Sequence, residues 1–418
     1  MPLLSGKSAF SQVTAIAVRR QVHAAFAWLH GNPKTIMDWQ REVVAIPAPP
    51  YGEQARAEWF AARFAEIGFS HVETDAAGNV LAMLPAAALP PESTGPVVVV
   101  SAHLDTVFPA GTPLNPVVDG DRLSGPGASD NGAGIVGMLA LAHALVHAQV
   151  ELAAPLILVG NVGEEGEGNL RGMWHFYRES PLADRIAAHI VLDGAGADAA
   201  VTQALGSSRF QATVTGPGGH SFTDAGTPNP IAALASALAA LVETPLPQEP
   251  RTTLNLGTIR GGTSVNSIPE SAQASIDFRS TNPEQLVRLE VALHRAMEDA
   301  VARCNAQAVG AGSSRGRLSF AIDRIGDRPA AHLPEDSVLL AALRAVDRHL
   351  GLHTDLRLGS TDANVPLSLG VPALSLGAGG EGGAAHTLGE WYSAKDRELG
   401  LRRVLVLVLA MLEWAAEQ

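Results

Sequence analysis

The sequence has 418 residues, and at about 150 residues per domain this length predicts two or three domains. Apolar residues form 46% and charged residues 17% of the chain, a composition that excludes a disordered protein and supports a large core. The 29 Lys and Arg against 42 Asp and Glu give a net charge of −13. Because no basic cluster interrupts this balance, we expect no nucleic-acid partner.

The single cysteine, Cys304, excludes an internal disulfide and a cysteine-rich zinc site. The N-terminal segment lacks the continuous apolar stretch of a signal peptide. The longest apolar run, Val404 to Leu412, is far shorter than the ~20 residues that a membrane span needs, and it predicts a buried terminal helix. We therefore expect a cytoplasmic protein with no membrane partner.

Helix and strand patterns alternate along the first part of the chain, which is typical of an α/β protein. Prolines in the segment Ile46 to Pro50 separate two helices. The run Pro96 to Ala102 is apolar without alternation, which predicts a strand buried on both faces of a helix-covered sheet. Predicted helices span 35–46, 52–67 and 133–148, and predicted strands lie within Val72 to Leu84, Pro96 to Ala102, Pro155 to Gly160 and His189 to Leu192.

From 207 to 312 the elements follow the order β-α-β-β-α-β of a ferredoxin-like fold, with Leu318 to Ile322 as a candidate last strand. We therefore expect a discontinuous first domain, 1–206 and 313–418, interrupted by a second domain, 207–312. The predicted elements of the second domain are the strands Arg209 to Thr215, Leu254 to Arg260 and Ala272 to Arg279 and the helices Asn229 to Thr244 and Glu284 to Cys304. The returning chain predicts a helix at 335–350, a loop at 358–364, a strand near 372–376, a Gly-rich loop at 377–385 and a final helix.

His103 and Asp105 follow directly on the first buried strand. Side chains two residues apart share one face of a strand, and open α/β sheets place their ligands at the carboxyl ends of strands. A metal-bound histidine usually donates its other ring N–H to an acceptor, a role for which Asp105 is positioned. A capped strand end without a ligand is the alternative for this short motif.

Further acidic and imidazole side chains follow other strands or Gly-rich turns. Asp130 lies in a Gly-rich turn before a helix, where capping by Ser129, Asp130 or Asn131 is the alternative to a cation site. The adjacent carboxylates of Glu164 and Glu165 repel each other unless a cation or a proton separates them. The alternative for these two and for Asp193 is a surface loop, and for His386 a histidine without function.

Taken together, two imidazoles and three carboxylates at one edge of a sheet suit zinc, with manganese or cobalt as alternatives. Five ligands exceed a closed tetrahedral site and suit two metals that share a bridging carboxylate. Glu164 is then left to act as a base. The proposed ligands are His103, Asp130, Glu165, Asp193 and His386.

Seven segments together resemble the M20 family of metallopeptidases, which includes tripeptide aminopeptidases, carboxypeptidases and N-acyl-amino-acid deacylases. The resemblance extends from about residue 35 onward, and residues 1–34 carry no motif of the family. It implies a zinc-exopeptidase-like mixed sheet flanked by helices, with an inserted lid domain that also forms the dimer interface. The segments are VSAHLDTV (100–107), GPGASDNGAG (125–134), GNVGEEGEG (160–168), VLDG (191–194), GPGGHS (216–221), GTSVNSIPESAQASIDFRS (262–280) and His386.

The resemblance implies a role for each matched residue. His103 and Asp193 would be the terminal ligands of one metal, Glu165 and His386 those of the other, and Asp130 the bridge. Asp105 would orient His103, and Glu164 would be the general base. In the lid, His220 would reach into the partner's active site, and Asn266 and Arg279 would contact substrate. For Arg279 a salt bridge within the lid is the alternative, for His220 a turn histidine. Asp362, in the segment GSTDAN, receives no firm role.

We therefore expect a homodimeric metallopeptidase with two divalent ions per subunit that cleaves an amide bond in a small peptide. In the family, an aspartate at position 193 resembles the aminopeptidase and dipeptidase branch, whereas a glutamate resembles the carboxypeptidase and deacylase branch. Release of an N-terminal residue from di- or tripeptides is thus favoured. The alternatives are a carboxypeptidase, a deacylase of N-acyl amino acids, a non-catalytic scaffold and a closed structural metal site.

Overall fold

The computed structural model describes residues 8–69, 71–84, 95–308 and 316–418. The chain forms two compact units: unit 1 comprises Met1–Ala204 and His332–Gln418, and unit 2 comprises Leu205–Ala331. Unit 2 is longer than the expected 207–312 because strand Ser319–Arg328 pairs along strand Gly206–Thr215 in its sheet. The chain therefore leaves unit 2 only after this last strand.

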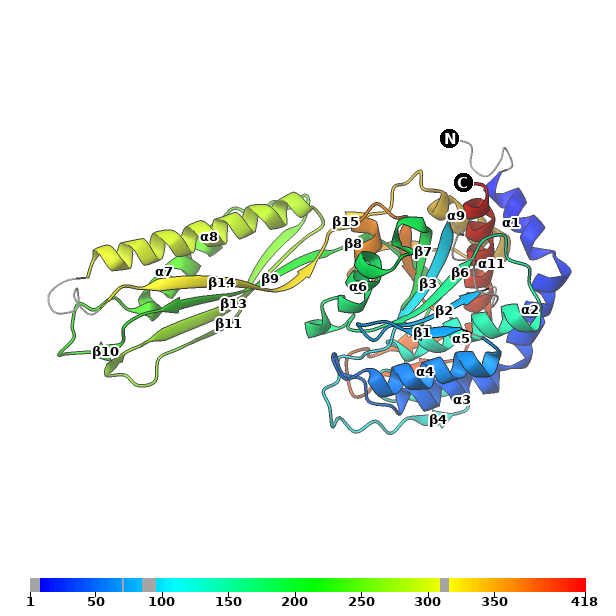
Figure 1. The fold of residues 1–418 in the computed structure, drawn as a ribbon, viewed down its shortest axis with the longest axis horizontal. Helices are drawn as coiled ribbons and strands as arrows, with labels where there is room; N and C mark the ends of the chain where they lie inside the picture. The colour runs from blue at the N-terminus through cyan, green and yellow to red at the C-terminus, as the bar shows by residue number, and fades with distance from the viewer. Residues whose placement is uncertain (1–7, 70, 85–94, 309–315) are drawn as a thin grey trace. The chain divides into compact units, whose positions relative to one another are not determined.

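The centre of unit 1 is a mixed sheet in which nine described strands take part (Figure 1). Its strand order is β1-β2-β6-β3-β7-β17-β8-β15, with β16 pairing to β8. The middle strands β6, β3, β7 and β17 run parallel, and every residue of β3 is buried, as its β-branched run predicts. The strands are β1 (Val72–Thr74), β2 (Val80–Leu84), β3 (Val97–His103), β6 (Leu156–Asn161), β7 (Ile186–Leu192), β8 (Ala199–Ala204), β15 (Ala331–His332), β16 (Asp355–Gly359) and β17 (Ala373–Leu376).

Helices flank this sheet, and the apolar side chains between helices and strands form the core (Figure 1). On one face, Val97, Val99 and Ile157 pack against Met173 and Phe176 of α6. The small residues of α5 allow close approach, because a side chain at Gly137 would collide with Ala378. The helices are α1 (Ala9–Ala17), α2 (Arg20–Gly31), α3 (Pro33–Val44), α4 (Gln54–Ile67), α5 (Gly132–His147), α6 (Arg171–Glu179), α9 (Val338–Leu350), α10 (Asn364–Ser368) and α11 (Arg397–Ala416), with short 3₁₀ turns at Gly166–Gly168 and Ala183–Arg185.

A small antiparallel sheet in unit 1 brings two distant loops together. Its order is β18-β19-β5-β4, so the β18–β19 hairpin, whose first strand forms within the expected Gly-rich loop 377–385, lies beside the β4–β5 hairpin that precedes α5. Residue Trp391 pairs with Ser124. The loop carrying Asp130 therefore begins at β5, and the loop carrying His386 ends at β19, the strand that pairs with β5. The four strands are β4 (Val117–Asp119), β5 (Arg122–Ser124), β18 (Glu381–Gly383) and β19 (Trp391–Ser393).

Unit 2 is an antiparallel sheet of order β11-β13-β9-β14 that packs against two helices. Asn229 and Asn282 cap the two helices, each before a proline in the first turn. With its element order, this topology confirms the expected ferredoxin-like arrangement. The elements are β9 (Gly206–Thr215), β10 (Gly219–His220), α7 (Pro230–Val242), β11 (Thr252–Gly261), β12 (Ser267–Ile268), β13 (Ser271–Ser280), α8 (Pro283–Ala306) and β14 (Ser319–Arg328).

The structure confirms the buried strands and most predicted helices to within a few residues. It adds α1 and α2, where no motif was recognised, and the strands β8 and β16. The expected loop at 358–364 begins at the end of β16 and ends at the start of α10. No helix in the described part of the chain is long and apolar enough to cross a membrane.

Candidate metal centre

The candidate centre lies where the parallel strands of unit 1 end at their carboxyl edge. His103 is the last residue of β3 and pairs in register with Asn161, the last residue of β6. Asp193 follows β7, and its backbone N–H bonds to Leu376 at the end of β17. The side chains that the sequence placed after separate strands therefore meet at one edge, as parallel strands require.

Asn131 fixes the loop that carries Asp130. Its side-chain amide donates to the Leu192 oxygen at 2.9 Å, and its oxygen accepts the N–H groups of Gly194 and Gly134, each at 3.0 Å. A side chain at position 134 would collide with this oxygen, which explains the glycine. Asn131 thus caps α5 and ties Asp130 to the strand end that presents Asp193.

The Asp105 carboxylate holds the glutamate pair. Its two oxygens accept the backbone N–H of Glu164 at 3.0 Å and of Glu165 at 2.8 Å. His103 Nδ1 lies 3.1 Å from the backbone oxygen of Asp105 and 3.7 Å from its carboxylate. Asp105 therefore contacts the histidine, as expected, but mainly through its main chain, and its carboxylate shapes the Glu164–Glu165 turn.

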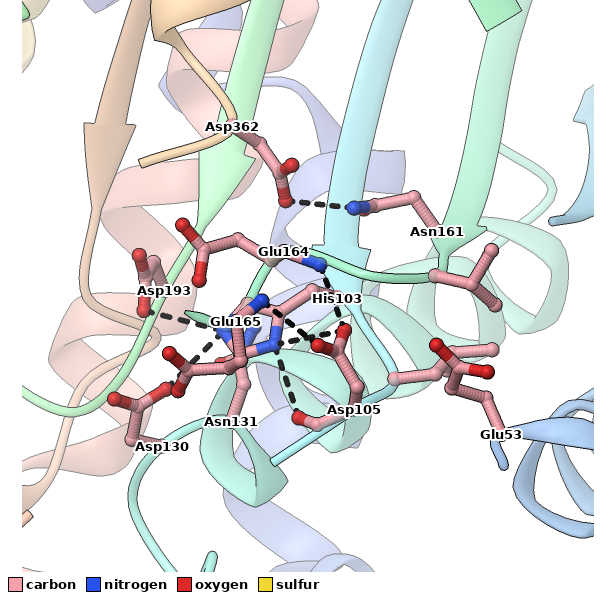
Figure 2. A network of polar contacts seen from close by, with 12 residues as sticks. Glu53, His103, Asp105, Asp130, Asn131, Asn161, Glu164, Glu165, Asp193 and Asp362 are labelled. Carbon is pink, nitrogen blue, oxygen red and sulfur yellow. Dashed lines mark hydrogen bonds and ion pairs between the residues drawn. The ribbon is translucent and has the colours of Figure 1, made fainter. Parts of the chain in front are cut away.

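The five predicted ligands form two clusters that share Asp130. Figure 2 labels His103, Asp130, Glu165 and Asp193. His103 Nε2 lies 3.1 Å from Asp130 Oδ1 and 3.7 Å from Asp193 Oδ1. His386 Nε2 lies 3.0 Å from Asp130 Oδ2 and 3.1 Å from Glu165 Oε1. In each cluster the ligand atoms lie within 4.8 Å of one another. The two carboxylate oxygens of Asp130 therefore face two different imidazoles.

Without a cation, the proton affinities of this centre are strongly shifted. Burial, and then repulsion from Glu164, raises the pKa of Glu165 to about 8. Contact with Asp130 raises the pKa of His386 to about 9. Burial disfavours a charged His103, but its bonds to carboxylates outweigh burial and raise its pKa well above the usual value. The same carboxylates and imidazoles that hold protons strongly here are the groups that a divalent cation would bind.

The hydrogen bonding of Asp130 also supports a metal site. Asp130 Oδ1 is buried and has no hydrogen-bond partner among the described residues, although His103 Nε2 is near. A buried carboxylate oxygen without a donor is costly. Imidazole and carboxylate ligands of this kind are those that zinc, cobalt and manganese prefer. The five residues present are therefore suited to hold two divalent ions.

Three buried polar residues lie near the centre, of which Glu390 and Arg56 were not identified from the sequence and Asp362 was left without a firm role. Glu390 is fully buried and accepts the N–H groups of the Asp130 loop. Asp362, given no firm role above, is fully buried and accepts a hydrogen bond from Asn161 at 2.7 Å (Figure 2). Burial, and then repulsion from Glu164, raises the pKa of Asp362 to about 8. The buried Arg56 binds the backbone oxygens of Leu104 and Ile46 and so fixes the end of β3.

The three remaining predicted site residues belong to unit 2. The His220 and Asn266 segments meet, because the N–H of Ser221 bonds to the Asn266 oxygen at 3.0 Å. Nδ1 of the exposed His220 accepts the N–H groups of Phe222 and Thr223, which leaves Nε2 as the protonated nitrogen of the neutral ring. Arg279 lies toward the other end of β13 and bonds to Asp277 at 2.8 Å. The structure thus shows the salt bridge that was the alternative for Arg279.

Similarity to known proteins agrees with this centre. Residues 99–410 match the model of the peptidase family M20/M25/M40. An Aspergillus clavatus protein named "Probable carboxypeptidase" is 30% identical over 272 residues, which cover 59% of this chain and 58% of that protein. The chain thus spans less than two thirds of this relative.

Two solved structures share the fold. Aminopeptidase PepT from Bacillus cereus is 19% identical, with a TM-score of 0.70 over 91% of this chain and 99% of that one. The YXEP protein of Bacillus subtilis, described as a dinuclear metal-binding peptidase of family M20, is 16% identical, with a TM-score of 0.62 over 92% and 99%. Because the family model covers most of its length and the fold agrees, this protein belongs to the peptidase family M20/M25/M40.

Proposed function

We propose that this protein is a dinuclear metal-dependent amide hydrolase that acts as an aminopeptidase on di- and tripeptides. The observation that carries the proposal is the sharing of Asp130 by two ligand clusters, one with His103 and Asp193 and one with Glu165 and His386. One carboxylate between two imidazoles is the arrangement of a bridged metal pair. Zinc is the ion we propose, with cobalt or manganese as alternatives.

A bound metal pair would supply an activated water and polarise the carbonyl of the scissile amide. Within the chain, Glu164 takes a proton from the attacking water and delivers it to the leaving amine. Glu164 also lies within ligand distance of His103 and Glu165. We assign it to proton transfer because the two clusters around Asp130 already use those two ligands.

The position of Glu164 supports this role. Its side chain is buried, and its backbone is held by the Asp105 carboxylate at the edge where the ligands meet. Asp105 fixes the histidine and the glutamate turn together, so a proton acceptor stays beside the ligands. A spare carboxylate of this kind distinguishes the proposed catalytic centre from a closed structural metal site.

In unit 2, we assign His220 to stabilise the oxyanion and Asn266 and Arg279 to contact substrate, roles that rest on the family resemblance. The N–H at Nε2 of His220 supports the first assignment, because an oxyanion needs a donor. Arg279 would have to exchange its salt bridge with Asp277 for a substrate carboxylate. We also propose that unit 2 forms the interface of a homodimer in the cytoplasm.

The end of the peptide that is cleaved can be tested directly. We propose aminopeptidase activity because position 193 is an aspartate and the fold is similar to that of aminopeptidase PepT. The alternative is a carboxypeptidase, and its support is that the Aspergillus relative is named "Probable carboxypeptidase".

A screen of tripeptides that are free, N-acetylated or C-amidated separates these activities. The aminopeptidase cleaves the free and C-amidated peptides and leaves the N-acetylated one intact. Cleavage of the N-acetylated peptide with sparing of the C-amidated one would establish a carboxypeptidase instead. Release of acetate from N-acetyl amino acids would establish a deacylase, and no turnover of any substrate by metal-loaded protein would establish the scaffold.

A further inference from the structure

Glu390 is a buried carboxylate bound entirely to the loop that carries Asp130. It is fully buried and directly precedes β19. Its Oε2 accepts the N–H of Gly127 at 2.9 Å, and its Oε1 accepts those of Ser129 at 2.8 Å and Asp130 at 2.7 Å. A single side chain thus organises three peptide groups of one loop.

No Lys, Arg or His that the structure describes forms an ion pair with Glu390, and the buried Arg56 attracts it only from beyond ion-pair distance. Burying a carboxylate is costly unless hydrogen bonds compensate its lost hydration. The three N–H donors provide that compensation, and charge-assisted bonds of this kind are short and strong. The loop and the carboxylate therefore fix each other, and an isosteric amide could not replace the carboxylate. It would place an N–H group opposite at least one backbone N–H.

The same hairpin also presents a proposed metal ligand. His386 lies four residues before Glu390 in the same loop, and the backbone N–H of Glu390 bonds to the Thr387 oxygen. The main chain adds a further link, because the N–H of Gly125 bonds to the Glu390 oxygen at 2.9 Å. Glu390 therefore connects the backbone that presents Asp130 to the hairpin that presents His386.

We propose that Glu390 is a positioning residue for the metal pair. By fixing the backbone at Asp130 against the His386 hairpin, it holds the Asp130 carboxylate with one oxygen toward each imidazole. Its effect on the metals passes through Asp130, and Glu390 itself ligates nothing. This inference rests on the dinuclear centre proposed above.

The test is a titration of the full chain with Co²⁺ after removal of metal by a chelator. Calorimetry gives affinity and stoichiometry, and visible absorption reports the ligand geometry of the bound ion. We expect two ions per wild-type chain. Glu390→Gln should bind them 10–100-fold more weakly, the usual cost of losing a group that orients a ligand, and with an altered spectrum. Glu381→Gln, an exposed glutamate on β18, is the matched control and should behave as wild type.

A double-variant comparison separates positioning from a general structural role. If Glu390 acts through Asp130, the double variant with Glu390→Gln and Asp130→Asn should bind Co²⁺ less than twofold more weakly than Asp130→Asn alone. Circular dichroism checks the fold of each chain. Should Glu390→Gln fail to fold, Glu390→Asp takes its place. The aspartate side chain keeps the carboxylate but is one methylene shorter. Glu390→Asp should therefore bind Co²⁺ more weakly than wild type and give a spectrum close to that of wild type.

Three results would overturn the inference. Wild-type affinity and spectrum in the folded Glu390 variants would remove any positioning role. Full additivity with Asp130→Asn would show that Glu390 acts on the fold and not through Asp130. Failure of the wild-type chain to take up Co²⁺ would overturn the proposed metal centre itself and this inference with it.

Discussion

The ring of His103 bonds through Nδ1 to the backbone oxygen of Asp105, at 3.1 Å, and not primarily to its carboxylate, which is 3.7 Å away. A carbonyl oxygen only accepts, so Nδ1 carries a proton, and Nε2 is the nitrogen that faces Asp130 and Asp193 and could bind a metal in place of its proton. The Asp105 carboxylate is thereby available to hold the backbone of Glu164 and Glu165.

Asp105→Asn should therefore disturb the glutamate turn as well as the histidine. The amide would place an N–H group against one of two backbone N–H donors. We expect metal affinity or turnover to fall by about 10–100-fold, as is usual when a group behind the ligands is lost. Metal titration and steady-state kinetics measure the effect. Asp119→Asn, an exposed aspartate on β4, is the control, and equal behaviour of the two variants would contradict the role of Asp105.

Glu164→Gln should separate proton transfer from metal binding. The amide keeps the shape of the side chain but cannot accept a proton, so kcat should fall by about 10²–10⁴-fold or more. The metal content of the purified variant, measured by elemental analysis, should equal that of wild type. Near-normal turnover would remove Glu164 from the mechanism, and loss of a metal would make it a ligand.

The proximity of the five proposed ligands could be predicted from the sequence because each follows a strand or turn with a clear local pattern. The apolar runs that end at His103 and before Asp193 predict buried parallel strands. Because such strands end at the same edge of the sheet, the residues that follow them are expected to lie close together. The same reasoning located the Glu164–Glu165 pair after β6. Residues that directly follow a predicted parallel strand could thus be located at the site from the sequence.

The residues that orient the ligands could not be found in this way. Glu390 contacts a loop 260 residues earlier in the chain, and no periodicity links the two segments. Asp362 lies in a segment whose composition resembles an exposed turn, yet the segment is buried, with the N–H of Thr361 bonded to the Asn364 side chain. Such positions depend on tertiary contacts that a local pattern does not record.

His189 should make the stability of unit 1 depend on pH. It is fully buried between Tyr177 and Ser101, and burial lowers its pKa to about 3. Below the unfolded pKa of about 6.5 the unfolded chain binds a proton that the folded chain does not. The folded state therefore loses about 1.4 kcal/mol per pH unit as the pH falls from about 6.5 toward 3.

His189→Gln keeps hydrogen-bonding groups but has no such proton. Relative to wild type, its free energy of unfolding should fall less steeply below pH 6.5. Urea unfolding of chelator-treated protein between pH 4.5 and 7.5 measures the slopes, with the exposed His353→Gln as control. Parallel curves for wild type and His189→Gln would show that His189 is not the titrating group.

The proposed role of His220 can be tested with mixed subunits. If His220 serves the active site of the partner, a dimer of one Glu164→Gln chain and one His220→Ala chain contains one complete site. Mixing the two inactive chains should then restore activity once subunits exchange, which a tag on one chain verifies. Exchanged dimers that are no more active than either parent would show that His220 acts within its own chain or not at all.

We propose that Asp130 bridges two metal ions, and anomalous X-ray scattering from crystals of the zinc-loaded protein tests this bridge most directly. We expect two zinc peaks per chain, ~3.5–4 Å apart as in two-metal sites, with one Asp130 oxygen on each ion. One ion should also bind His103 and Asp193, and the other Glu165 and His386. A single zinc peak in fully active protein, or two peaks without Asp130 between them, would contradict the claim.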